Sequence, residues 1–219
     1  ISSAYAKISS SGGNVTVTGT GGGSGAGDYN YGVKVSSTAS ITSAINGNVS
    51  VTGTGGGSSL STIGFNLGVF LADSSSIKSS GSGTLSITGN GGLNSGGNYN
   101  HGVLLGVSNF IQAGYGGITI TGNKTTGATS YGIGMDQTTL ATTAGTGGQI
   151  SFSANGIYLG STARIETTGT ATLNSSESIS GSGLAVANSL TLAASSGISI
   201  NTLTTILASV SSTTGDIII

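Results

Sequence analysis

Short apolar patterns recur in a fixed order along the chain. In residues 83–116 they occupy positions 85–88, 102–105 and 109–113. Each pattern alternates or nearly alternates apolar with polar residues, which is the period of a strand with one buried face. Three short strands separated by Gly-rich corners cannot bury their apolar side alone and need copies of themselves above and below. The stretch therefore predicts one rung of a solenoid, a rung being one passage of the chain through three strands.

Copies of these patterns continue over the chain. Predicted first strands lie at 15–18, 49–52, 85–88, 118–121 and 150–153, with weaker ones at 171–173, 198–200 and 217–219. Predicted second strands begin with Gly and lie at 32–35, 68–71, 102–105, 132–135, 156–159 and 183–186. Predicted third strands surround Ile8, Ile41, Ile77, Ile111, Leu140 and Ile165.

The spacing between strands separates two kinds of corner. The last aliphatic residue of a second strand stands six residues before the centre of the third strand, as in Val35 and Ile41. The distance from first to second strand instead varies, from 18 residues between Val15 and Val33 to 7 between Ile150 and Ile157. We therefore predict an all-β, parallel β-helix (β-solenoid) of about seven rungs, with three short strands and one variable loop per rung. Residues 1–219 form a single domain in this prediction, with less regular rungs from about residue 168.

A second repeated feature precedes each second strand. Asn30, Asn66 and Asn100 all stand three residues before the first aliphatic residue of that strand. Stacked Asn side chains can hydrogen-bond along a column, as they do in cross-β structures. The pattern predicts a structural Asn ladder.

The composition combines features of a flexible linker with features of a folded domain. The chain has 219 residues with 42 Gly, no Pro, no Trp and only 5% charged residues, which is typical of a flexible linker. However, 35% of the residues are hydrophobic, the mean hydropathy is +0.26, and Val, Ile and Leu are placed periodically. A disordered segment has no reason for such periodicity, so we expect a narrow core.

Charge and cysteine content exclude several classes. The net charge is −1 and no basic run occurs, so we expect no nucleic-acid partner. No apolar run approaches the roughly 20 residues of a membrane-spanning helix. The absence of Cys excludes a disulfide scaffold. Because the chain begins at Ile1, we expect any leader to be removed or to lie outside it.

The segments NVSVTGTGGG, NYGVKV and GTLSITGNGG resemble the β-strand repeats of filamentous haemagglutinin-like exoproteins and related giant bacterial surface adhesins. The resemblance covers nearly the whole chain from about Ile8. It implies a right-handed parallel β-helix, secretion, and a structural role at the cell surface or outside the cell, as a segment of a fibre, filament or adhesin.

Catalytic chemistry has weak support in the sequence. Polysaccharide lyases and hydrolases, some of which are also parallel β-helices, need clustered carboxylates. The acidic residues occupy different places within their rungs: Asp28, Asp73, Asp136, Glu166, Glu177 and Asp216. The only histidine, His101, takes a corner position that other rungs fill with Tyr, Leu or Asn, and we interpret it as a structural side chain. We expect no enzyme, no cofactor and no metal site, with a polysaccharide lyase or hydrolase as the least favoured alternative.

Two outward-facing columns of side chains remain as candidate surfaces. The first strands predict a hydroxyl ladder, interpreted either as a solvated face or as a flat array facing glycans or ice. Its members are Thr16, Thr18, Ser50, Thr52, Ser86, Thr88, Thr119 and Thr121. The second strands place Phe70, Leu104 and Tyr158 outward, which indicates a contact face or one covered by the variable loop.

The two ends of the chain also read as strand. Ile8 stands in a third-strand position, and residues 216–219 end in an apolar run. Uncovered end rungs present unpaired strand edges. We therefore expect the rungs to continue beyond both ends, either as more of the same chain or by head-to-tail self-association.

Overall fold

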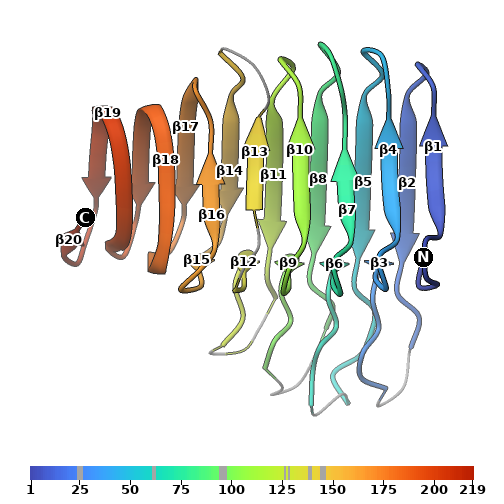
Figure 1. The fold of residues 1–219 in the computed structure, drawn as a ribbon. Coiled ribbons are helices and arrows are strands. Elements are labelled where there is room, and N and C mark those ends of the chain that lie inside the picture. The colour runs from blue at the N-terminus through green and yellow to red at the C-terminus, as the bar shows by residue number, and fades with distance from the viewer. Residues whose placement is uncertain are drawn as a thin grey trace.

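The computed structural model describes residues 1–23, 27–60, 63–93, 98–125, 127, 129–137, 140–143 and 147–219. The secondary structure of these residues consists of strands, and the pairs that these strands form are parallel (Figure 1). The prediction of an all-β fold with parallel strands is confirmed. The bounds are β1 (Lys7–Ser10), β2 (Val15–Thr20), β3 (Val33–Val35), β4 (Ser40–Ser43), β5 (Val49–Thr54), β6 (Val69–Leu71), β7 (Ser76–Lys78), β8 (Leu85–Asn90), β9 (Val103–Leu105), β10 (Phe110–Ala113), β11 (Ile118–Asn123), β12 (Ile133–Met135), β13 (Leu140–Thr143), β14 (Ile150–Ala154), β15 (Ile157–Leu159), β16 (Arg164–Glu166), β17 (Thr170–Ser175), β18 (Ile179–Ala194), β19 (Ile198–Ser212) and β20 (Ile217–Ile218).

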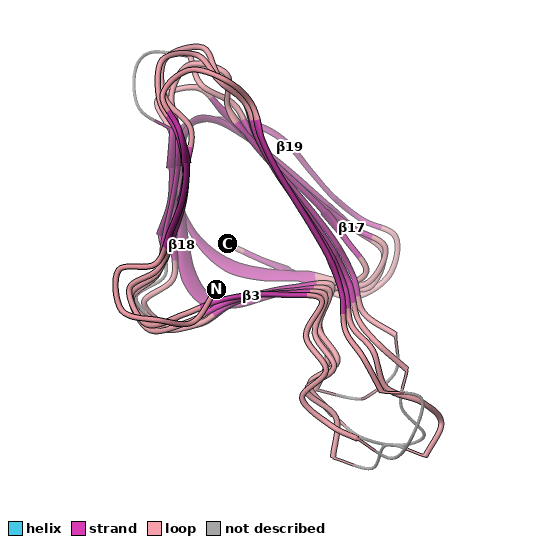
Figure 2. Ribbon diagram, turned by 90° about the vertical axis from the view of Figure 1, so that its right-hand side faces the viewer, coloured by secondary structure: helices cyan, strands magenta, loops and turns pink. Residues whose placement is uncertain are grey.

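The strands pair in three columns, which form the three sides seen along the molecule in Figure 2. The first column runs β2, β5, β8, β11, β14, β17 and then parts of β18 and β19. The second runs β3, β6, β9, β12, β15, parts of β18 and β19, and β20. The third runs β1, β4, β7, β10, β13, β16 and parts of β18 and β19. This arrangement fits a parallel β-solenoid.

Beyond β17 the turns become shorter and the strands longer. Within β18, Ile179 pairs in the second column, Leu184 in the third and Leu190 in the first, so one strand passes through all three sides. Ile198 and Ile217 follow Ile179 in the second column. The predicted placements of residues 183–186 in a second strand and of 198–200 and 217–219 in first strands are therefore wrong. The spacing of the long rungs does not apply here because the variable loop is gone and each turn takes about 19 residues.

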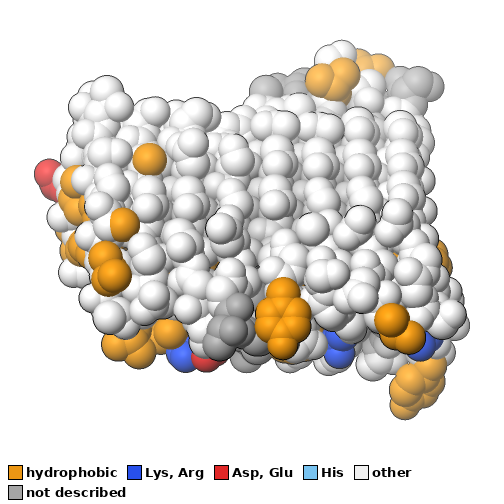
Figure 3. All heavy atoms as spheres, turned by 90° about the horizontal axis from the view of Figure 1, so that it is seen from above, with side chains coloured by type: hydrophobic (Ala, Val, Ile, Leu, Met, Phe, Trp, Pro, Cys, Tyr) orange, Lys and Arg blue, Asp and Glu red, His pale blue; other side chains and the backbone are white. Residues whose placement is uncertain are grey.

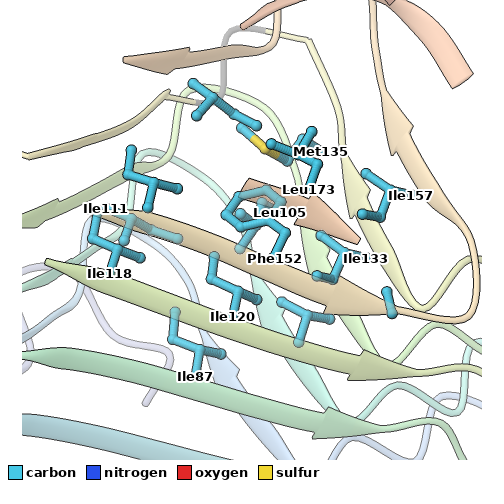
Figure 4. Packing of buried hydrophobic residues seen from close by; sticks show 14 of the residues in the cluster. Ile87, Leu105, Ile111, Ile118, Ile120, Ile133, Met135, Phe152, Ile157 and Leu173 are labelled. Atoms are coloured by element: carbon cyan, nitrogen blue, oxygen red, sulfur yellow. The ribbon is translucent and has the colours of Figure 1, made fainter. Parts of the chain in front are cut away.

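The core is a set of apolar columns inside the three sides. Ile41, Ile77 and Ile111 lie in register in the third column and are fully buried. Another column in register joins Val51, Ile87, Ile120, Phe152 and Leu173. Figure 4 shows such side chains pointing into the space that the strands enclose. Because each rung covers the apolar atoms of its neighbours, burial is gained only by stacking.

The corner between first and second strands is held by close backbone contact. A Cβ atom on Gly89 would lie 2.0 Å from the carbonyl oxygen of Gly102, and Gly53 and Gly122 meet Gly68 and Gly132 in the same way. Neither Gly89 nor Gly102 has a positive φ. Glycine is required at this corner of the long rungs because two chain segments approach too closely for any side chain, whereas Ala154 takes the position in register with Gly122 in the shorter rung that follows.

Candidate functional site

The outward residues of the first column form two rows in register, which we call the hydroxyl face. One row is Thr16, Ser50, Ser86, Thr119 and Ser151, and the next is Thr18, Thr52, Thr88, Thr121 and Ser153. Parallel strands place neighbours within a row about 4.8 Å apart and the two rows about 6.7 Å apart. All eight residues of the predicted ladder lie on this face and are half-buried or exposed.

The hydroxyl face carries no charge. None of the strands in the first column contains Asp, Glu, Lys or Arg. Seen from above, the molecule presents regular rows of uncharged polar side chains and backbone, with charged side chains only near the margin (Figure 3). The face can therefore offer hydroxyl groups at regular spacing, but it has no group that could act as a catalytic acid or base.

The predicted Asn ladder is built from side-chain-to-backbone hydrogen bonds. The Asn30 backbone N–H donates to Asn66 Oδ1 at 3.0 Å, and the Asn66 backbone N–H donates to Asn100 Oδ1 at 3.1 Å. The first pair also has an amide-to-amide bond, from Asn30 Nδ2 to Asn66 Oδ1 at 3.0 Å. Asn66 and Asn100 are fully buried. These bonds satisfy backbone N–H groups that lie outside the strands. The Asn ladder therefore has a structural role.

On both sides of the Asn ladder stand aromatic rings, a region that we call the aromatic corner. Tyr29, Phe65 and Tyr99 stack in successive rungs with ring centroids 5.1 and 4.8 Å apart. All three have a positive φ, between 60° and 64°, which costs of order 1 kcal/mol for a bulky residue. Tyr29 and Tyr99 remain 54% and 43% exposed, so their rings are only partly buried by the stacking.

The stacking continues diagonally across the second column. His101 stacks on Tyr131 at 5.6 Å between centroids, and Tyr131 stacks on Tyr158 at 4.9 Å. Tyr99 is tilted by 49° against His101 at 6.2 Å. The aromatic corner is thus a continuous series of rings from Tyr29 to Tyr158.

The predicted contact residues lie in register in the second column. Phe70, Leu104 and Tyr158 occupy one outward row, with Lys34 before them and Gly134 between Leu104 and Tyr158. All three are half-buried. Because neighbouring rings cover part of Phe70 and Tyr158, the row is less exposed than its outward direction indicates.

The missing side chain at Gly134 leaves a hollow, which we call the Gly134 cavity. It has a volume of about 380 Å³ and lies between Leu104 on one side and Tyr158 on the other. Tyr99, Tyr131 and His101 also line it, and Asp136 supplies a carboxylate. A cavity of this size with aromatic walls and a few polar groups has the features of a small-ligand site.

His101 is neutral in this setting. It is only 4% exposed, and burial lowers its pKa from 6.5 to about 4. Its Nδ1 accepts a hydrogen bond from the Tyr131 backbone N–H at 2.9 Å, so the proton of the neutral ring is on Nε2. Burial also raises the pKa of Tyr131, and the neighbouring Tyr158 adds to the shift. His101 therefore serves the corner as a hydrogen-bond acceptor and stacking partner.

The acidic residues have separate surroundings. Asp28 Oδ1 accepts the Gly64 backbone N–H at 3.0 Å, Glu166 pairs with Arg164 at 2.8 Å, and Glu177 pairs with Lys124 at 2.6 Å. Asp136 faces the Gly134 cavity. Within the described part of the chain no cluster of three or more His, Cys, Asp or Glu residues is placed to hold a metal ion.

Sequence reasoning missed the Gly134 cavity, although its signal is present. Tyr31 and Lys34 in one rung correspond in spacing to Tyr131 and Gly134 three rungs later. A comparison of these two segments would have shown a large side chain replaced by none inside an otherwise bulky row.

Comparison with other proteins adds no assignment. Among the described residues, no helix has the length and apolar character needed to cross a membrane. No family model, curated protein or solved structure matches this chain.

Proposed function

We propose that the chain is a rigid structural segment of an extracellular or cell-surface fibre or adhesin of bacterial type, built as a right-handed β-solenoid of about seven rungs. The observation that carries this proposal is the pairing of every strand with its equivalent in the next rung, over a core of stacked apolar columns. A body of this kind has stiffness along its length and a repeated surface. Both suit a protein that holds a contact surface away from a cell.

Force spectroscopy on the single chain tests this role. Pulling from the two ends is expected to give resistance followed by stepwise lengthening, because each rung contacts only its neighbours. Release of the rung between Val49 and Leu85 would add about 12 nm of extended chain. A chain that lengthens smoothly at low force bears no load, and this result would contradict a structural role.

The hydroxyl face favours a second candidate, a glycan- or ice-binding module. Its two in-register rows of uncharged hydroxyl groups are the specific observation behind it. Replacement of Thr52 and Thr88 by Lys places two like charges in adjacent strands on this face. A binding module is expected to lose retention on a glycan array, or ice-growth inhibition, in this variant. A purely structural rod is expected to show neither activity before or after the change.

A further inference from the structure

An arrangement of two stacked rings beside one outward-facing position of the second column occurs twice. In the first copy, Tyr31 stacks on Phe70 with centroids 5.4 Å apart. The ammonium of Lys34 lies over both rings, 5.0 Å from the Tyr31 centroid and 5.8 Å from that of Phe70. An ammonium at this distance from aromatic faces is attracted by the ring quadrupole.

The second copy keeps the rings and lacks the ammonium. Tyr131 stacks on Tyr158 at 4.9 Å, as Tyr31 does on Phe70. The register of the second column places Gly134 in the same row as Lys34. The space beside these rings is the Gly134 cavity, with a volume of about 380 Å³.

The charge of the second copy is complementary to a cation. Asp136 lines the Gly134 cavity, whereas the position in register with it in the first copy is Ser36. Asp136 is exposed, and its Oδ1 accepts only the adjacent Gln137 N–H at 2.8 Å among the contacts of described residues. The ion pairs between described residues lie elsewhere, at Lys124–Glu177 and Arg164–Glu166. The cavity thus carries one carboxylate with no cation paired to it in that set.

We propose that the Gly134 cavity binds a quaternary ammonium group, of the kind found in choline. Ring faces and a nearby carboxylate are the two features that attract such a group. Leu104, Tyr131 and Tyr158 form largely apolar walls of the cavity. Because a quaternary ammonium has no N–H donors, it gives up no donated hydrogen bonds to water when it contacts these walls. A phosphate or sulfate group is disfavoured because Asp136 repels it.

The only methionine of the chain reports on this site. Met135 follows Gly134 and is buried in the core directly behind the cavity, so protein labelled with ¹³C in the methionine methyl group gives one signal that is sensitive to changes in packing at the site (Figure 4). The full chain is titrated with choline chloride at constant ionic strength. The control ligand is 3,3-dimethylbutan-1-ol, which has the shape of choline without its charge. We expect a saturable shift of the Met135 signal with choline, with a Kd on the order of 1 mM, and a much weaker response to the alcohol.

Three variants test the residues in the proposal. Gly134→Lys supplies a tethered ammonium, as Lys34 does in the first copy, and is expected to abolish choline binding. The added Cβ would lie 3.2 Å from the flexible Leu104 side-chain tip and at ordinary contact distance, 3.6 Å, from His101 Nδ1, so the fold is expected to persist. Tyr158→Leu and Asp136→Asn are each expected to weaken binding, roughly tenfold for the ring and about threefold for the charge. Asp73→Asn, at an exposed carboxylate two rungs away, is the matched control and should leave binding unchanged.

Each other outcome overturns the proposal. Equal responses to choline and to the neutral alcohol would show that the cavity binds apolar groups without any preference for a positive charge. Tighter binding of N-acetyl-lysine methylamide than of choline would contradict the preference for a quaternary group. Choline binding that survives Gly134→Lys, with the Met135 signal still dispersed as in a folded protein, would place the ligand elsewhere.

Discussion

At the scale of the residue, the stability of the aromatic corner depends on a neutral histidine. His101 is packed between Tyr99 and Tyr131, and its Nδ1 must keep a lone pair free to accept the Tyr131 N–H. Burial disfavours the charged ring, and the nearby Lys124 acts in the same direction, while Asp136 opposes it. The corner therefore has an acceptor whose protonation would break a hydrogen bond and bury a charge.

This predicts a loss of stability in mild acid. The pKa of His101 is about 4 in the folded state and 6.5 when unperturbed, so below pH 6.5 the unfolded chain binds a proton that the folded chain does not. Stability contributed by neutral His101 is fully present above pH 6.5 and falls as the pH drops toward 4. The loss is about 1.4 kcal/mol per pH unit, reaching about 3 kcal/mol. Urea unfolding followed by circular dichroism at pH 7, 6 and 5 measures it.

His101→Asn is the control for this titration. The side-chain oxygen of Asn can still accept the Tyr131 N–H, as that of Asn155 accepts the Lys124 N–H at 2.7 Å. Because the variant has no histidine left, its stability is expected to be nearly flat between pH 7 and 5. If the two proteins lose stability equally over this interval, His101 is not the buried neutral group described.

At the scale of the element, the corner between the first and second strands is set by glycine packing. Gly89 at the end of β8 lies against the Gly102 backbone, and the same contact recurs at Gly53 and Gly122. The contact places the start of the second strand directly beside the end of the first strand. It also leaves the connecting segment free to vary in length, because the corner closes without it.

Gly89→Ala is expected to destabilise the chain by about 3 kcal/mol, because its methyl group would overlap the Gly102 carbonyl and the backbone must shift. Gly22→Ala is the matched control. A Cβ at Gly22 meets nothing within 4 Å, so a change below about 0.5 kcal/mol is expected. The melting temperatures of the two variants are compared. Equal shifts would mean that the corner does not depend on close backbone contact.

The strands of the long rungs could be predicted from sequence, and the short turns could not. Ile41, Ile77 and Ile111 stand at a constant distance from the preceding second strands, so their shared column follows from spacing alone. Residues 183–186 also have Gly followed by alternating aliphatic residues, yet they pair with β16 in the third column. In a turn of about 19 residues, the same short pattern can form a strand in any of the three columns. Its column is decided only by its register with the preceding turn.

The candidate site was predictable in part for a related reason. Phe70, Leu104 and Tyr158 follow from the period of the second strand. The cavity beside them depends on Tyr99 and Tyr131, which lie outside any strand, and on a side chain that Gly134 does not have. Such a site is a relation between neighbouring rungs, so no single rung of sequence contains it.

At the scale of the whole molecule, the fold depends on one repeated relation, the stacking of each rung on the next in register. On the hydroxyl face, the row that begins at Thr18 continues through Ser153 to Asn174, Ala193 and Ser211. These positions are exposed or half-buried. The chain has no Cys, so spin labels attach only where Cys is introduced.

Distances between pairs of spin labels along this row test that relation most directly. One label is placed at Thr18→Cys and the second at Ser153→Cys, Asn174→Cys, Ala193→Cys or Ser211→Cys. These positions lie four, five, six and seven strands away, so backbone separations of about 19, 24, 29 and 34 Å are predicted. Narrow distributions that increase by about 5 Å per step would support a stacked rod. Separations that fail to increase in this order, or broad distributions for every pair, would contradict it.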